Sequence, residues 1–234
     1  MKYKCEVASI DCLMLRMFDG ISESNMPWLL AAAQRLRGLF GDRLVDLVPS
    51  YTTLMVHYDL RRLNASEARA LVADALSGLQ PTEDAAGRTT TLPVWYDSSV
   101  GPELKLLSLS LGVPIKRVIE LHSSREYRVF ALGFAPGYAY MGLLDEALSS
   151  PRLSTPRKHV AGGSVAVAER QTAVYPKASP GGWNVLGRTP AQLFDRSLEG
   201  YSLLQPGDRV RFVPIDRNEF IRLGGDDSPL EELV

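Results

Sequence analysis

The stretch 133–144, GFAPGYAYMGLL, differs most clearly from the rest of this 234-residue sequence. It combines three glycines, a proline and aromatic residues, and it contains no charged residue. Apolar loops of this kind are either buried or used as binding surfaces, because exposed apolar area costs free energy. The stretch therefore predicts a buried turn or the wall of a binding site.

Short β-rich runs surround this stretch from residue 125 onward. Glycine and proline separate the runs, as turns between strands require. The segment 205–208, QPGD, is a strong turn signal before the last run. Such closely spaced strands predict a compact antiparallel sheet or barrel. The runs are REYRVFALGF (125–134), GSVAVAE (163–169), QTAVYP (171–176), GWNVLG (182–187) and DRVRFVPI (208–215).

The N-terminal part of the chain instead alternates between strand and helix patterns. Apolar residues recur at helical spacing in 24–41 and 64–79, and the second helix starts with a capping box of Asn64 and Glu67. The resulting order, β-α-β-β-α-β, is that of a ferredoxin-like unit. The predicted strands are 5–16, 43–50, 52–60 and 89–97.

The predicted fold is therefore α+β with two domains. A small ferredoxin-like domain occupies 1–92, and a β-barrel domain occupies 93–216. A polar linker at 81–87 precedes the last strand of the first domain, and a helical hairpin is predicted within 101–124. Residues 217–234 are expected to form a loosely held, polar and acidic tail.

Composition and charge exclude several classes of function. With 45% hydrophobic and 23% charged residues, the chain has enough apolar side chains for a globular core. The net charge of -1 gives no attraction to nucleic acid or acidic lipid. No apolar run reaches the roughly 20 residues that span a bilayer, and the start of the chain lacks the core of a signal peptide. We expect a cytoplasmic protein without nucleic-acid or membrane partners.

Familiar catalytic signatures do not occur in the sequence. The histidines, His57, His122 and His159, show no zinc-binding spacing, so no metal site is predicted. The phosphate-binding loop GxxxxGK(S/T), a GxGxxG after a strand and the hydrolase elbow GxSxG are also missing. Cys5 and Cys12, on one predicted strand, face opposite sides and are expected to be free thiols.

The segment 133–190 remains as a candidate site. Its cations Arg157, Lys158 and Arg188 suit a phosphate or a carboxylate, which arginine binds with a bidentate fork. Glycine turns let a backbone approach a ligand closely, and aromatic rings provide flat apolar walls. The same residue types also serve the turns and the interior of a barrel, and the residues alone leave both interpretations open.

The motifs of the second half also follow a recognisable order. GFAPGYAYMGLL is followed by PR and TPR within 151–157, then GSVAVA, QTAVYP, SPGGWNVLGRTP, LFD and PGDRVRFVPI. Together with VPSYTTLMVHYDL upstream, the set resembles the family of 5-oxoprolinase B subunits, also called allophanate hydrolase subunit 1 or KipI, over about residues 4–215. The resemblance implies a small α+β domain followed by a cyclophilin-like β-barrel.

The resemblance also implies an activity. Such proteins act with a barrel-bearing C subunit and an A subunit, and the complex uses ATP, with Mg²⁺, to open 5-oxo-L-proline to L-glutamate through phosphorylation of the lactam. That step needs positioning and charge stabilisation more than a protein nucleophile. Under this hypothesis the catalytic residues are Arg157, Lys158, Arg188 and His159. Substrate and ATP would contact Gly133, Phe134, Pro136, Gly137, Tyr138, Tyr140, Gly163, Ser164, Gln171, Thr172, Tyr175, Gly181, Gly182 and Trp183.

Other functions stay open at this point. A KipI-like member would bind and inhibit a sensor histidine kinase, with the apolar loop as a protein interface. Action on allophanate or a related amide is a further alternative. Prolyl isomerisation is suggested only by the barrel, and one barrel fold hosts many functions.

Overall fold

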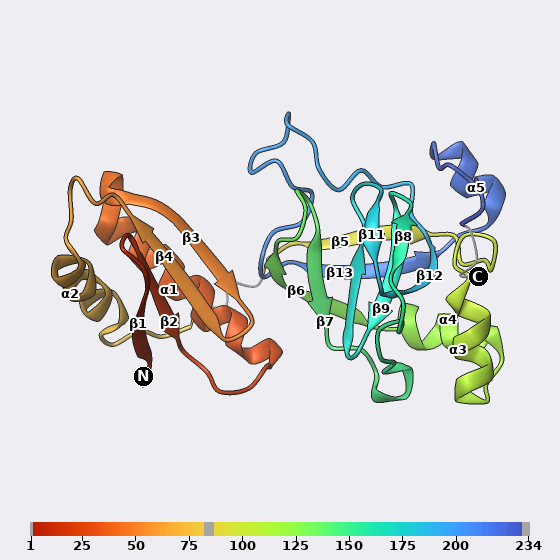
Figure 1. Ribbon diagram of the computed structural model, residues 1–234, viewed down its shortest axis with the longest axis horizontal. Helices are drawn as coiled ribbons and strands as arrows, with labels where there is room; N and C mark the ends of the chain where they lie inside the picture. The colour runs from red at the N-terminus through yellow and green to blue at the C-terminus, as the bar shows by residue number, and fades with distance from the viewer. Residues whose placement is uncertain (1, 82–86, 231–234) are drawn as a thin grey trace. The chain divides into compact units, whose positions relative to one another are not determined.

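The N-terminal unit, Met1–Gly87, carries a four-stranded antiparallel sheet (Figure 1). The computed structural model describes residues 2–81 and 87–230. The elements of this unit are β1 (Lys4–Ser9), β2 (Cys12–Arg16), α1 (Met26–Phe40), β3 (Leu44–Ser50), β4 (Thr53–Tyr58) and α2 (Ala65–Leu76), with short 3₁₀ helices at Glu23–Asn25 and Gly41–Arg43. The strand order in the sheet is β1-β2-β4-β3.

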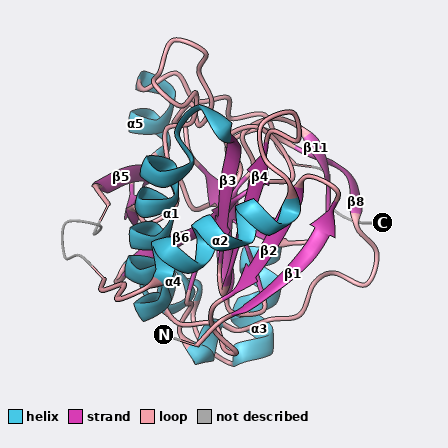
Figure 2. Cartoon of the chain, turned by 90° about the vertical axis from the view of Figure 1, so that its left-hand side faces the viewer, coloured by secondary structure: helices cyan, strands magenta, loops and turns pink. Residues whose placement is uncertain are grey.

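Helices α1 and α2 lie across one face of this sheet, as Figure 2 shows. Every second residue of β2 and β4 is buried on that side, and the residues between them are half-buried or exposed on the other side. Helix α1 has Pro27 in its first turn and Gly41 at its end. Helix α2 begins with the capping box of Asn64 and Glu67, which confirms that prediction.

The predicted strand order of this domain is wrong in two places. The expected single strand 5–16 is a hairpin, because a turn at Ile10 and Asp11 separates β1 from β2. Tyr58 fixes this turn against β4: its hydroxyl donates to the carbonyl of Ile10, and its N–H donates to the carbonyl of Asp11. The strand expected at 89–97 pairs within the other unit instead. The order is therefore ββαββα, not the ferredoxin-like order.

The C-terminal unit begins at Arg88, before the boundary expected at residue 93. Most of the predicted linker, 82–86, lies outside the described residues. No helix within 2–81 or 87–230 is both long enough and apolar enough to cross a bilayer. The elements of this unit are β5 (Thr89–Val94), α3 (Glu103–Leu111), α4 (Ile115–Ser123), β6 (Glu126–Leu132), β7 (Ala139–Gly142), β8 (Arg157–Val160), β9 (Ser164–Ala168), β10 (Gln171–Val174), β11 (Ser179–Gly181), β12 (Asn184–Arg188), β13 (Arg209–Pro214) and α5 (Arg217–Arg222), with a 3₁₀ helix at Glu146–Leu148.

Seven strands of this unit form a nearly closed β-barrel, in the order β12-β9-β10-β7-β6-β13-β5. Neighbours are antiparallel except for β5 and β13, which are parallel. The edges meet where Trp95, just after β5, pairs with Arg188 at the end of β12. Each of the two residues donates its N–H to the other's carbonyl at 2.9 Å. The expected barrel is present, and the strand assigned to the first domain completes it.

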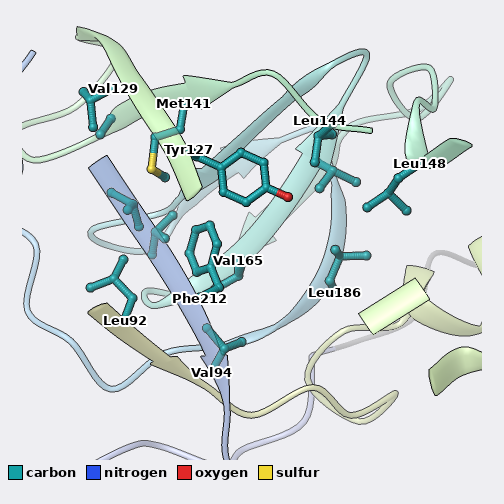
Figure 3. Close-up of a cluster of buried hydrophobic side chains, with 14 of the residues drawn as sticks. Leu92, Val94, Tyr127, Val129, Met141, Leu144, Leu148, Val165, Leu186 and Phe212 are labelled. Carbon is teal, nitrogen blue, oxygen red and sulfur yellow. The ribbon is translucent and has the colours of Figure 1, made fainter. Parts of the chain in front are cut away.

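Aliphatic and aromatic side chains from opposite walls fill one side of the curved sheet (Figure 3). Tyr127 and Phe212 lie near the centre, with ring centroids 5.7 Å apart. Along β9, Val165 belongs to this core while Ala166 belongs to a second cluster on the opposite face of the sheet, as strand alternation requires. Helices α3 and α4, the predicted helical hairpin, add leucine and valine side chains to the core.

The expectation of a loosely held tail is wrong for residues 217–230. Helix α5 places Phe220 against Trp95, with ring centroids 5.4 Å apart. The guanidinium of Arg188 donates to two tail carbonyls, that of Asp226 at 2.6 Å and that of Ser228 at 2.9 Å. The tail is therefore anchored at the point where the barrel closes.

Gly187→Ala is expected to destabilise the barrel, because a Cβ at this position would lie 2.5 Å from the carbonyl oxygen of Trp95. Overpacking of this kind costs about 1–3 kcal/mol. Urea unfolding of the full chain, followed by tryptophan fluorescence, measures the change. Gly133→Ala is the matched control, because a Cβ there meets nothing within 4 Å. An equal decrease in the free energy of unfolding for the two variants would show that the close approach of Gly187 to Trp95 is not important for stability.

Candidate functional site

A pocket of about 410 Å³ lies between α3 and the segment that leads into β8. Volumes of this size suit small-molecule ligands. The lining combines apolar side chains with two cations and one carboxylate, and one of the cations is Arg157, which was predicted from the sequence. The lining residues are Pro102, Glu103, Lys105, Leu106, Leu109, Leu153 and Arg157.

A buried ion pair forms part of the pocket wall. Arg157, the first residue of β8, donates through Nη2 to Oε1 of Glu103, the first residue of α3. Their side chains are only 4% and 2% exposed. The other oxygen of Glu103 accepts from the backbone N–H of Val185 at 2.9 Å. No role was predicted for Glu103. Its place at the start of a predicted helix, where a carboxylate is favourable, could have marked it as a structural residue. Each charge needs the other, because an unpaired buried charge is strongly unfavourable.

The predicted aromatic residues gather into one cluster around Tyr138. Its ring centroid lies 4.9 Å from that of Tyr140 and 5.4 Å from that of Tyr175. Trp183 lies 6.2 Å from Tyr138, and Phe134 lies 5.2 Å from it. Phe134 is 63% exposed, whereas Tyr138 and Trp183 are buried. Burial raises the pKa of the Tyr138 and Tyr175 hydroxyls above the ordinary value of tyrosine.

Arg152 and Leu153 connect this aromatic cluster with the pocket. The guanidinium carbon of Arg152 lies 6.0 Å from the ring centroid of Trp183, within the range of a cation–π contact. The N–H of Leu153 donates to the carbonyl of Gly182 at 2.8 Å, and Leu153 also lines the pocket. The resulting surface is apolar and positively charged, and it suits a small ligand that carries a carboxylate.

Two of the three predicted phosphate-binding cations are structural. Arg157 is held by Glu103, and Arg188, at 2% exposure, is held by tail carbonyls. Burial lowers the pKa of Arg188, and nearby tail carboxylates oppose that shift. Lys158 and His159 are exposed on β8. Arg157, Lys158 and Arg188 therefore do not fit the phosphate site that was predicted for ATP. The guanidinium groups of Arg157 and Arg188 already bind other groups of the protein.

Two glycines that were predicted to face a ligand make room for protein atoms instead. A Cβ at Gly181 would lie 2.2 Å from the hydroxyl oxygen of Tyr175, and a Cβ at Gly163 would lie 2.4 Å from the carbonyl oxygen of Thr189. The remaining predicted ligand contacts differ in their access to solvent. Ser164, Thr172 and Gly137 are buried, Gln171 and Gly182 are half-buried, and Gly133 and Pro136 are exposed.

His122 is a buried residue for which no role was predicted. Its Nε2 lies 2.8 Å from Oγ1 of Thr172, and its Nδ1 lies 2.7 Å from the hydroxyl of Tyr96. Because Thr172 donates its own hydrogen to the carbonyl of Ala166, Nε2 is the donor and Nδ1 the acceptor of a neutral imidazole. Burial lowers the pKa of His122 to about 3. His122 therefore fastens α4 to β10, and Thr172 is its structural partner.

Comparison with known proteins identifies the family. The family model of the carboxyltransferase domain, subdomain C and D, matches residues 3–204. The B subunit of 5-oxoprolinase from Escherichia coli O157:H7 is 37% identical over 209 residues, which cover 87% of this chain and 95% of that protein. The chain belongs to the family of 5-oxoprolinase B subunits. The family predicted from the ordered motifs is thereby confirmed.

Solved structures extend the comparison of this 5-oxoprolinase family member. The crystal structure of TTHA0988 shares 38% identity and a TM-score of 0.77, over 88% of this chain and 40% of that one, so this chain spans less than half of TTHA0988. K. lactis urea amidolyase gives a TM-score of 0.75 over 97% of this chain and 16% of that one. At 15% identity, the second similarity concerns the fold alone.

Arg157→Ala is expected to lower the free energy of unfolding by about 3–5 kcal/mol, because the carboxylate of Glu103 would remain buried without a counter-charge. Urea unfolding of the purified chain measures the loss. Lys158→Ala changes the exposed neighbour and should alter stability by less than about 0.5 kcal/mol. The double variant Glu103→Gln/Arg157→Ala should recover part of the loss. If Arg157→Ala were as stable as the control, the ion pair would not be structural.

Folding stability is expected to decrease as the pH falls from 6.5 towards about 3 through the contribution of His122. The pKa of His122 is lower in the folded chain than in the unfolded chain, so the unfolded chain binds a proton in this window that the folded chain excludes. Each pH unit removes up to about 1.4 kcal/mol. Urea unfolding at a series of pH values measures the slope. His122→Gln should flatten it, and parallel slopes for variant and wild type would contradict the assignment.

Proposed function

We propose that this chain is the B subunit of an ATP-dependent 5-oxoprolinase, which opens 5-oxo-L-proline to L-glutamate. The observation that supports this most is 37% identity to a 5-oxoprolinase B subunit across 95% of that protein's length. In this proposal the chain works in the cytoplasm with the A and C subunits of the enzyme. Its barrel is of the cyclophilin-like type, and the C subunit has a similar one.

ATP, with Mg²⁺, would supply the phosphoryl group that activates the lactam. Arg157 and Arg188 offer no free guanidinium for the nucleotide, because both are buried and bound by other groups. Lys158 and His159 stay accessible on β8. We therefore assign most phosphate contacts to the other chains of the enzyme, which explains why this chain would be active only in the complex.

The pocket beside α3 is the proposed place of the amide substrate on this chain. 5-Oxoproline carries one carboxylate and an otherwise compact ring with apolar methylene groups. Lys105 is exposed at the pocket and can pair with the carboxylate. Leu106 and Leu109 lie beside it and are 58% and 70% exposed, respectively. Exposed apolar side chains of this size are typical of a surface that a ligand or a partner covers.

Co-expression with the A and C subunits tests the proposal. The three chains should purify together, consume ATP only when 5-oxo-L-proline is present, and release glutamate. The same assay with allophanate in place of 5-oxo-L-proline shows which of the two amides the complex hydrolyses. Turnover of allophanate without turnover of 5-oxoproline would contradict the choice of substrate, and failure of the chains to associate would contradict the place of this chain in the enzyme.

A complex that carries Lys105→Ala tests whether the substrate binds in the pocket beside α3. Loss of a hydrogen bond to a charged group costs about 1.5–3 kcal/mol, so kcat/KM for 5-oxoproline should fall by at least about tenfold while the three chains still associate. Lys116→Ala changes an exposed lysine of α4 that does not line the pocket, and it should leave kcat/KM unchanged. Equal kcat/KM values for the two variants would exclude the pocket as the substrate site.

A further inference from the structure

Three side chains with metal-binding atoms meet in the N-terminal unit. Asp11, Cys12 and His57 each offer one ligand atom, and these atoms all lie within 4.8 Å of one another. Cys12 of β2 stands directly opposite His57 of β4 in the antiparallel pair, so both side chains leave the same face of the sheet. Asp11 precedes Cys12 in the turn, and its Oδ2 lies 3.0 Å from Nε2 of His57.

The three side chains are accessible without being fully solvated. All three are half-buried, and the side chains of Asp11 and His57 are each 32% exposed. Cys12 and His57 lie on the face of the sheet opposite the buried residues of β2 and β4, so neither α1 nor α2 covers them. This degree of exposure lets an ion enter and leaves a coordination position for water.

Neighbouring groups hold the carboxylate in place. The hydroxyl of Ser9 donates to Oδ1 of Asp11, which leaves Oδ2 directed at His57. The thiol of Cys12 also forms a hydrogen bond with Asp11. The backbone carbonyl of Asp11 accepts from the N–H of Tyr58 at 3.0 Å, which ties the turn to β4. Such supporting contacts orient the ligands of metal sites.

We propose that Asp11, Cys12 and His57 form a binding site for a divalent transition-metal ion of the zinc class. One imidazole nitrogen, one thiolate and one carboxylate oxygen are the donor types that zinc takes, with water in the fourth position. Donor atoms around tetrahedral zinc lie roughly 3.5 Å apart, so small side-chain rotations bring these atoms into place. Magnesium and calcium prefer a shell of oxygen ligands, which this set does not provide.

A bound ion would link the turn between β1 and β2 to β4. Asp11 and His57 are 46 positions apart in the sequence, so no local spacing motif announces the site. Because the ion binds the folded arrangement, it stabilises the unit in proportion to its affinity and concentration. The site is built from residues of the N-terminal unit alone, and it does not depend on the proposed function.

Titration of the full-length, metal-free chain with Co²⁺ tests the site, because cobalt coordinated by a thiolate absorbs in the near ultraviolet and the visible. One equivalent of Co²⁺ should produce the thiolate charge-transfer band and tetrahedral d–d bands, and Zn²⁺ should remove both. Cys12→Ser should abolish the charge-transfer band. Asp11→Asn and Ser9→Ala should each weaken binding by at least about tenfold.

Cys5→Ser is the matched control, because Cys5 is the other free cysteine of the unit and is not part of the cluster. It should keep the full spectrum. Circular dichroism of each metal-free variant checks folding, and if Cys12→Ser is unfolded, the near-isosteric Asp11→Asn decides the question. Absence of a thiolate band in the wild type, its survival in Cys12→Ser, or unchanged affinity in a folded Asp11→Asn would overturn the proposal.

Discussion

Closure of the barrel between Trp95 and Arg188 is the constraint on which the C-terminal unit depends. An open sheet of seven strands would present two edges of unpaired N–H and C=O groups. The paired backbone hydrogen bonds of Trp95 and Arg188 join those edges, and Gly187 makes the close approach possible because it has no side chain. The guanidinium of Arg188 then holds the tail carbonyls. Arg188 therefore takes part in closing the barrel through its backbone and holds the C-terminal segment through its side chain.

Strand β12, which closes the barrel, also contacts the candidate site. The backbone N–H of Val185 on that strand holds the carboxylate of Glu103, and Glu103 in turn holds Arg157 at the pocket. The geometry of the pocket wall is thus coupled to the strand that closes the sheet. On the face of the sheet opposite the core of Figure 3, Ala166, Ala168 and Ala173 belong to one buried cluster with Tyr138 and Trp183. The aromatic cluster and the pocket then meet at Arg152 and Leu153.

Features with local causes could be predicted well. The capping box at Asn64 needs only residues three positions apart, and the helical hairpin and the β-rich runs follow from their spacing of apolar and turn residues. The aromatic residues named from the sequence come together in one cluster, and their role as ligand contacts stays a prediction. The turn at Asp11 was missed because the run 5–16 contains no glycine or proline, and only the pairing of β1 with β2 shows where the chain turns.

The sequence by itself determined the family, the barrel-forming runs and the residue types from which a site could be built. Tertiary structure alone decided which charges are available to a ligand. Arg157 is 54 positions from Glu103, and Arg188 is 38 and 40 positions from the two carbonyls that it binds. A charged side chain acts according to its partners and its access to water, and strand pairing and burial between distant segments set both. For the same reason His57 becomes a neighbour of Asp11 and Cys12 only when β2 pairs with β4.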